Sequence, residues 1–167
     1  MKVKILNNIL PPETNIRIIE ALCEHHWFIA FDKTNDRTKK IFLKKNNGFS
    51  INTVLKGNVI VDSILNFYGY IIFDIIKEKI NIKAKIYRLY WNMYFRDSQT
   101  ESHMDMEENG YKSIIYNLHT TDGGTEIENY FYPDKLGQAK IFDSNLLHKG
   151  IGPTHDNVRF NLNIIYK

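Results

Sequence analysis

Near its end the chain reads R-F-N-L-N-I-I-Y, residues 159–166. Apolar and polar side chains alternate through most of this stretch, which is the pattern of a β-strand with two different faces. The apolar face comprises Phe160, Leu162, Ile164 and Tyr166, and the polar face comprises Arg159, Asn161 and Asn163. A buried row of polar groups is unfavourable unless it has partners. We therefore expect the apolar face to pack under helices, and the polar face either to be solvated or to hold a bound dicarboxylate.

Other short segments of the second half also have the composition of strands. They are residues 83–94, 113–118, 125–128 and 139–142, with turn signals at 122–124 and 133–134. Short strands separated by turns are typical of an all-β sandwich or barrel. The expected fold class is mainly β with flanking helices, specifically a double-stranded β-helix, which is a jelly roll of the cupin-like kind.

The first half of the chain predicts helices that support this β core. Pro11 and Pro12 can open a helix, because proline is tolerated in the first turn. Its apolar face would carry Ile16, Ile19, Leu22, Cys23 and either His26 or Trp27. A second helix is predicted over 59–79, and short strands over 41–43 and 49–51. We expect one domain, 1–167, with helices and outer strands in 1–82 and the β core in 83–167.

Composition and charge exclude several classes of protein. With 167 residues, of which 43% are hydrophobic and 13% aromatic, the chain can bury a core and is not of the disordered class. A net charge of +3 is too small to favour nucleic acid as a partner. The single cysteine, Cys23, excludes an internal disulfide and suits a reducing compartment. Without a signal peptide or an apolar run of about 20 residues, we expect a cytoplasmic protein with no membrane partner.

Three residues have the chemistry of a metal site. His103 and Asp105 form an H-x-D motif, and His148 follows 45 residues after His103. In an extended segment the first two side chains point the same way and could chelate one ion. Together the three match the 2-His-1-carboxylate set of non-haem iron(II) proteins. Taken singly they have plainer explanations, such as a turn that Asp105 stabilises and an exposed loop histidine at position 148.

From about 85 to 167 the chain resembles the iron(II)- and 2-oxoglutarate-dependent oxygenases, most closely the small prolyl-hydroxylase-like members of microbes and phages. The matching segments, in the family's order, are R-L-Y-W-N-M-Y (88–94), S-H-M-D (102–105), S-I-I-Y-N-L-H (113–119) followed by D-G-G-T-E (122–126), A-K-I-F-D-S-N-L-L-H-K-G (139–150) and R-F-N-L-N-I (159–164). The joint order and spacing are more specific than any single motif. The resemblance implies the double-stranded β-helix and a cytoplasmic enzyme of a microbe or of a phage-infected cell.

The resemblance also implies a role for each residue of the site. His103, Asp105 and His148 would be the iron(II) ligands. Arg159 would bind the distal carboxylate of 2-oxoglutarate, as a guanidinium can do with two parallel hydrogen bonds. The cofactor would be iron(II), with 2-oxoglutarate and O₂ as co-substrates and ascorbate as a candidate reductant.

Three further positions match the family less closely. Tyr94, nine residues before His103, matches a tyrosine that often assists the arginine. Asn117 stands where related enzymes place another co-substrate contact, often a tyrosine. Asn161 stands where some relatives have a hydroxyl residue. The departures at Asn117 and Asn161 leave open which of the three side chains contact 2-oxoglutarate.

The reaction implied is hydroxylation of a C–H bond, coupled to decarboxylation of 2-oxoglutarate to succinate. The expected substrate is a peptidyl residue such as proline, or a small molecule. A nucleobase demethylase or hydroxylase is the second reading, although that subfamily usually has a second arginine where this chain has Ile165. A cupin-like metalloenzyme and a binding module, neither of which uses 2-oxoglutarate, also stay open. Specificity would lie in loops 31–47, 96–102 and 130–138.

Overall fold

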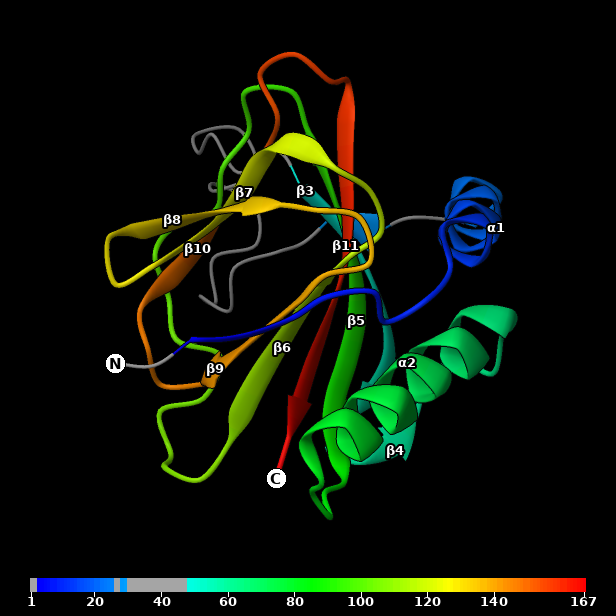
Figure 1. Cartoon of the computed structure of the whole chain (residues 1–167), viewed down its shortest axis with the longest axis vertical. Helices are drawn as coiled ribbons and strands as arrows, with labels where there is room; N and C mark the ends of the chain where they lie inside the picture. The colour runs from blue at the N-terminus through cyan, green and yellow to red at the C-terminus, as the bar shows by residue number, and fades with distance from the viewer. Residues whose placement is uncertain (1–2, 26–27, 30–47) are drawn as a thin grey trace.

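The structure is a computed structural model that describes residues 3–25, 28–29 and 48–167. Within these residues, two antiparallel sheets and two helices make up the fold (Figure 1). The larger sheet has the strand order β1 (Lys4–Leu6), β9 (Ala139–Asp143), β6 (Lys112–Asn117), β11 (Val158–Tyr166), β5 (Ile86–Phe95), β3 (Gly48–Leu55) and β2 (Phe28–Ile29), with β4 (Asn58–Val59) paired to β3. The smaller sheet has the order β10 (His148–Ile151), β7 (Thr121–Ile127) and β8 (Tyr130–Asp134). This mainly β architecture confirms the predicted fold class.

The last strand, β11, lies inside the larger sheet and has the two faces that its alternation predicts. It pairs with β5 on one side and with β6 on the other. Leu162 and Ile164 are fully buried on the face that packs against the helices, and the ring of Tyr166 lies 5.5 Å from that of Phe73. Burial of this face is the main source of stability for the sheet.

The polar row of β11 faces the interior and is not solvated. Arg159, Asn161 and Asn163 are 0%, 1% and 3% exposed. The inward face of the larger sheet therefore resembles a binding site rather than an outer surface, because buried polar groups require partners.

The first helix, α1 (Pro12–Cys23), begins at the predicted prolines. Its buried face differs from the predicted one, since it presents Asn15, Ile18 and Leu22, whereas Ile16 is 55% exposed. The hydroxyl of Tyr116 on β6 donates to the side-chain oxygen of Asn15 at 2.6 Å. This buried hydrogen bond fixes the helix to the sheet and decides which face turns inward.

The second helix, α2 (Ile64–Ile80), starts five residues later than predicted, because Val59 belongs to β4. It begins after Ser63, whose extended backbone is typical of an N-cap. A glycine lets it approach the sheet closely, since a Cβ on Gly69 would lie 2.6 Å from Leu89 Cδ1 on β5. In Figure 1, α1 and α2 lie on the same side of the larger sheet.

The predicted turn at 122–124 is wrong, because these residues lie inside β7. The strand contains a register shift between Thr121 and Gly124. Glycine is required there by a close approach, since a Cβ on Gly124 would lie 2.4 Å from the carbonyl oxygen of Tyr132. Glycine within a strand commonly marks such an approach or a bulge.

The predicted turn at 133–134 and the predicted loop at 130–138 are also wrong in part, because 130–134 forms β8. Pro133 is tolerated there because β8 lies at the edge of its sheet. The actual turn between β7 and β8 is at Glu128 and Asn129, whose φ angles of 48° and 68° suit a two-residue hairpin.

The remaining predicted strands are confirmed where the structure describes them. Those at 49–51, 83–94, 113–118 and 139–142 correspond to β3, β5, β6 and β9, with boundaries that differ by a few residues. The predicted strand at 41–43 and the predicted loop at 31–47 lie outside the described residues. Within the described ranges, neither helix combines the length and the apolar character of a membrane span.

Candidate active site

The three predicted metal ligands come together between two backbone segments. His103 pairs with His148 as an isolated antiparallel bridge, in which each backbone N–H donates to the other carbonyl at 2.9 Å. The backbone N–H of Asp105 donates to Ser144 O at 2.9 Å. These bonds bring ligand atoms of the two imidazoles and the carboxylate within 4.8 Å of one another. Asp105 and His148 are buried, and His103 is exposed.

Backbone carbonyls orient both imidazole rings. His103 Nδ1 lies 2.8 Å from Glu101 O, and His148 Nδ1 lies 2.9 Å from Leu146 O. A carbonyl oxygen can only accept, so each neutral ring has its proton on Nδ1 and an acceptor lone pair on Nε2. This tautomer is the one in which Nε2 can bind a metal, and such supporting bonds are typical of histidine ligands.

The carboxylate of Asp105 is held by four polar side chains. Its Oδ1 accepts from Arg88 at 2.8 Å and from Tyr90 at 3.1 Å, and its Oδ2 accepts from Ser113 at 2.6 Å and from Asn163 at 3.3 Å. Burial alone would raise the pKa of Asp105, but the hydrogen bond and charge of His148 in its protonated form, together with Arg88 and Ser113, hold that pKa well below its usual range. The group is therefore ionised and ready to bind a cation.

The donor set fits a divalent transition metal. Two imidazole nitrogens and one carboxylate oxygen are the ligands that non-haem iron(II) takes from a protein. His148 Nε2 lies 3.4 Å from Asp105 Oδ2. The side-chain oxygen of Asn163, beside Asp105, is buried without a hydrogen-bond partner among the described residues. It leaves an acceptor for a ligand bound at this site.

Arg159 lies on the same inner surface, fully buried and paired with an acid that the sequence did not reveal. Its Nε donates to Asp134 Oδ2 at 2.6 Å, and its Nη2 lies 3.3 Å from Asp134 Oδ1. Nη2 also donates to the hydroxyl of Thr125 at 3.1 Å. The ring of Tyr94 lies 4.7 Å from the guanidinium carbon. Tyr94 therefore lies beside Arg159, and its contact with 2-oxoglutarate stays a prediction.

Asn117 also reaches this charged cluster, through Asp134 and a second buried cation, Lys140. Lys140 Nζ donates to Asp134 Oδ1 at 2.5 Å. In the amide orientation that satisfies its neighbours, Asn117 donates to Asp134 Oδ1 at 3.1 Å and accepts from Lys140 Nζ at 3.2 Å. In the corresponding orientation, Asn161 accepts from Arg159 Nη1 at 3.2 Å and Nη2 at 3.0 Å. Asn117 and Asn161 are cross-strand partners on β6 and β11.

Burial and charge act in opposite directions on the two groups that join Arg159. Burial alone would raise the pKa of Asp134, but the charges of Arg159 and Lys140 lower it. Burial lowers the pKa of Lys140 to about 8, against the opposing charge of Asp134. Asp134 is thus ionised at neutral pH, and Lys140 still carries most of its charge.

The prediction from sequence missed several residues of the site, which are Arg88, Tyr90, Ser113, Asp134 and Lys140. One signal was present in the sequence. Lys140 interrupts the apolar run of β9, where a charged side chain requires a buried partner. The sequence does not reveal Asp134 as this partner, because Pro133 and Asp134 together predict a turn, whereas Asp134 is the last residue of β8.

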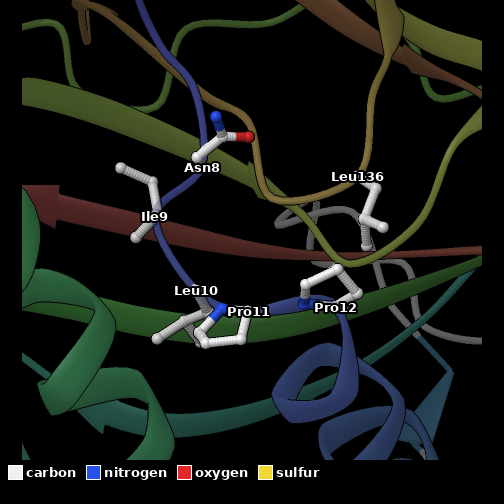
Figure 2. A pocket seen from close by; sticks show the side chains of 6 residues that line it. All are labelled: Asn8, Ile9, Leu10, Pro11, Pro12 and Leu136. Carbon is white, nitrogen blue, oxygen red and sulfur yellow. The ribbon is translucent and has the colours of Figure 1, made fainter.

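A separate hollow of about 330 Å³ lies where the N-terminal segment meets the loop after β8 (Figure 2). It is lined by Asn8, Ile9, Leu10, Pro11, Pro12 and Leu136. None of these side chains is ionisable, so the hollow offers none of the metal-binding chemistry of the inner surface.

Two solved structures of oxygenases are similar to this chain in architecture. A 2OG-Fe(II) oxygenase-family oxidoreductase from Burkholderia pseudomallei is 15% identical, with a TM-score of 0.69 over 99% of this chain and 84% of that one. A prolyl hydroxylase from Trichoplax adhaerens, in complex with a hypoxia-inducible-factor peptide, is 13% identical, with a TM-score of 0.68 over 98% and 82%. The chain has the fold of the 2-oxoglutarate and iron(II) oxygenases.

An enzyme with this fold need not be a hydroxylase. The α-ketoglutarate-dependent carbocyclase SnoK of nogalamycin biosynthesis is 12% identical, with a TM-score of 0.71 over 98% of this chain and 78% of that one. No family model matches the sequence, and no curated protein matches it either. The fold therefore identifies an architecture used by oxygenases, and the function must be argued from the site.

Proposed function

We propose that the chain is a dioxygenase that uses iron(II) and 2-oxoglutarate to hydroxylate a C–H bond. One observation carries the proposal: a histidine–aspartate–histidine cluster and a buried guanidinium, Arg159, share one inner surface. On β11, Asn163 contacts Asp105, and Arg159 lies two inward positions away. A 2-oxo dicarboxylate can bind the metal at one end and Arg159 at the other. A cupin-like enzyme or a binding module without 2-oxoglutarate would have no need of Arg159 there.

Each residue has a defined task in this proposal. His103, Asp105 and His148 would hold iron(II), and Arg159, with Tyr94 and Asn117, would orient the co-substrate. Bound iron(II) supplies the redox chemistry by which 2-oxoglutarate and O₂ yield succinate, CO₂ and the hydroxylated product, with ascorbate as a candidate reductant. The protein contributes position and exclusion of water, since Asp105 and Arg159 are 4% and 0% exposed.

The proposed substrate is a peptidyl residue such as proline. The resemblance of residues 85–167 to prolyl-hydroxylase-like oxygenases supports this substrate class. The Trichoplax prolyl hydroxylase, which has this fold, is bound to a peptide.

A nucleobase substrate is the second candidate, because the structure weakens one argument against it. The position of the missing second arginine, Ile165, pairs across the sheet with Arg88. Arg88 lies on β5, and its guanidinium reaches Asp105 at 2.8 Å. A guanidinium is thus present at this part of the site, although it comes from a neighbouring strand.

The deciding experiment measures succinate formed from 2-oxoglutarate by anaerobically purified protein after iron(II) and O₂ are added. Parallel reactions contain no substrate, a proline-rich peptide or an N-methylated oligonucleotide, and mass spectrometry follows each substrate. We expect the peptide to gain one oxygen atom and to stimulate succinate formation. The oligonucleotide arm tests the second candidate.

Two histidine variants provide matched controls. His148→Ala removes a buried candidate ligand and should abolish succinate formation. His155→Ala removes a highly exposed histidine, in the loop before β11, that bonds to Asp122 of β7, and it should retain full turnover. Absence of succinate from the wild-type protein in every arm, with no binding of 2-oxoglutarate, would refute the proposed function.

A further inference from the structure

Three buried charges meet at the end of the inner surface, and their sum is not zero. The side chains of Arg159, Lys140 and Asp134 are each 0% exposed. Two cations and one anion leave a formal charge of +1. An uncompensated charge is expensive in a protein interior. The cluster is therefore suited to receive one more negative charge.

Apart from Asp134, which contacts Nε and Nη2, the hydrogen-bond partners of the Arg159 guanidinium among the described residues are neutral. Nη1 and Nη2 donate to the amide oxygen of Asn161, and Nη2 donates to the hydroxyl of Thr125. A carboxylate that replaces a neutral amide acceptor gains charge-assisted hydrogen bonds. Asp134 keeps the guanidinium plane fixed through Nε while that exchange takes place.

Lys140 contacts the amide next to the one that Arg159 contacts. Its Nζ contacts the Asp134 carboxylate and the oxygen of Asn117, so two of its three donors have partners among the described residues. Asn117 is the cross-strand neighbour of Asn161, which contacts Arg159. Lys140 and Arg159 thus contact adjacent amides and share the single carboxylate of Asp134, so a second anion beside them would complete the neutralisation of their charges.

We propose that Lys140 is a second cation for the distal carboxylate of 2-oxoglutarate, which binds against the amides of Asn117 and Asn161 between Lys140 and Arg159. Asp134 remains in place as the counter-ion that orients both cations. This inference rests on the proposed function and deepens it. It assigns to β9 a binding residue for the co-substrate, beside the arginine of β11.

The test compares two ligands that share a 2-oxo acid head and differ at the other end. 2-Oxoglutarate has a distal carboxylate, and pyruvate does not. Each is titrated into the full chain loaded anaerobically with Mn(II), and binding is measured by calorimetry. The variants are Lys140→Met, Lys140→Arg, Arg159→Met and, as the control, Lys77→Met, which changes a lysine of α2 on the opposite side of the larger sheet.

We expect Lys140→Met to weaken 2-oxoglutarate binding at least tenfold and to leave pyruvate binding unchanged. Lys140→Arg should restore part of the loss, and Lys77→Met should match the wild type. Wild-type affinity in Lys140→Met would overturn the inference. So would an equal loss of both ligands, because Lys140 would then act on the fold or on the metal.

The same titrations separate failure of the inference from failure of the proposed function. If Arg159→Met loses 2-oxoglutarate while Lys140→Met does not, the role of Lys140 is refuted and the proposed function stands. If the wild-type protein binds Mn(II) but not 2-oxoglutarate, the proposed function fails and the inference fails with it.

Discussion

The two faces of the larger sheet are made by the same strands and do opposite things. On β11, Leu162 and Ile164 are fully buried against the helices, and Arg159 and Asn163 are almost as deeply buried on the other side. The outer face gains free energy chiefly from apolar burial, with one buried hydrogen bond between Tyr116 and Asn15. The inner face offsets part of this stabilisation, because removing its charges and amides from water costs free energy that their pairing only partly returns. The difference shows that the helix-backed face supplies stability and the inner face supplies chemistry.

The largest loss of stability should follow a break in the charge pairing of the inner face. Asp134→Asn removes the carboxylate shared by Arg159 and Lys140 and leaves two cations buried without a counter-ion. Removing one partner of a buried ion pair typically costs about 3–5 kcal/mol of unfolding free energy. Urea denaturation at pH 7 measures the change, and a loss below about 1 kcal/mol would show that the pairing is not important for stability.

Asp134→Asn should also change how the unfolding free energy depends on pH in acid. The pKa of Asp134 is lowered in the folded protein from the ordinary value of 3.8. Its contribution to stability is therefore present above pH 3.8 and is lost as the pH falls through the lower folded value. The unfolding free energy of Asp134→Asn should depend less steeply on pH below 3.8 than that of the wild type.

On the outer face, Leu162→Ala should cost about 2–5 kcal/mol, because it leaves a cavity in the core under the helices. Its effect on iron affinity should be negligible, since the side chain points away from the metal ligands. The control is Leu147→Ala, whose side chain is 49% exposed and whose loss should change stability by less than about 0.5 kcal/mol. If Leu162→Ala weakened iron binding in a still-folded protein, the separation of the two faces would be wrong.

A smaller effect should follow from Arg88→Met, which removes a hydrogen-bond donor to Asp105. Residues that support a metal ligand typically contribute about 10- to 100-fold to metal affinity. Competition between the protein and a chelator for Mn(II) measures this change. Arg17→Met alters an exposed arginine of α1 and serves as the control. Unchanged Mn(II) affinity in Arg88→Met would mean that the remaining donors hold Asp105 without it.

The smallest expected effect is a change in the affinity for 2-oxoglutarate with pH. Burial lowers the pKa of Lys140 to about 8, so its positive charge is present below that value and is lost above it. The groups that face it are Asp134 on β8, Arg159 on β11 and the neutral amide of Asn117 on β6. Affinity for 2-oxoglutarate should therefore fall between about pH 7.5 and 9 in the wild type and stay flat in Lys140→Met. Parallel curves for the two proteins would contradict this role.

Local pattern was enough to predict part of this molecule. The alternation at 159–166 gives β11 and both of its faces, and the H-x-D motif gives two residues that do meet His148. Both depend on periodicity along the chain, which sequence shows directly. The joint order of the motifs added the fold class, which the structure confirms.

The errors arose where tertiary contacts override local signals. Glycine at 124 suggests a turn, but it is required by the carbonyl of Tyr132 on a neighbouring strand. Asp134 was assigned to a turn because it follows proline, and its partners Lys140 and Arg159 come from two other strands. Pairings between distant strands leave no periodic trace in a sequence, so the charged cluster became visible only in the structure.

The inner face is proposed to bind iron(II) and 2-oxoglutarate together. Equilibrium dialysis under anaerobic conditions measures both ligands on the wild-type protein, His148→Ala and Arg159→Met. We predict that the wild type binds one iron and one 2-oxoglutarate. His148→Ala should lose both ligands, whereas Arg159→Met should keep iron and lose 2-oxoglutarate. Equal loss of iron in the two variants, or iron binding that does not depend on His148, would contradict the account.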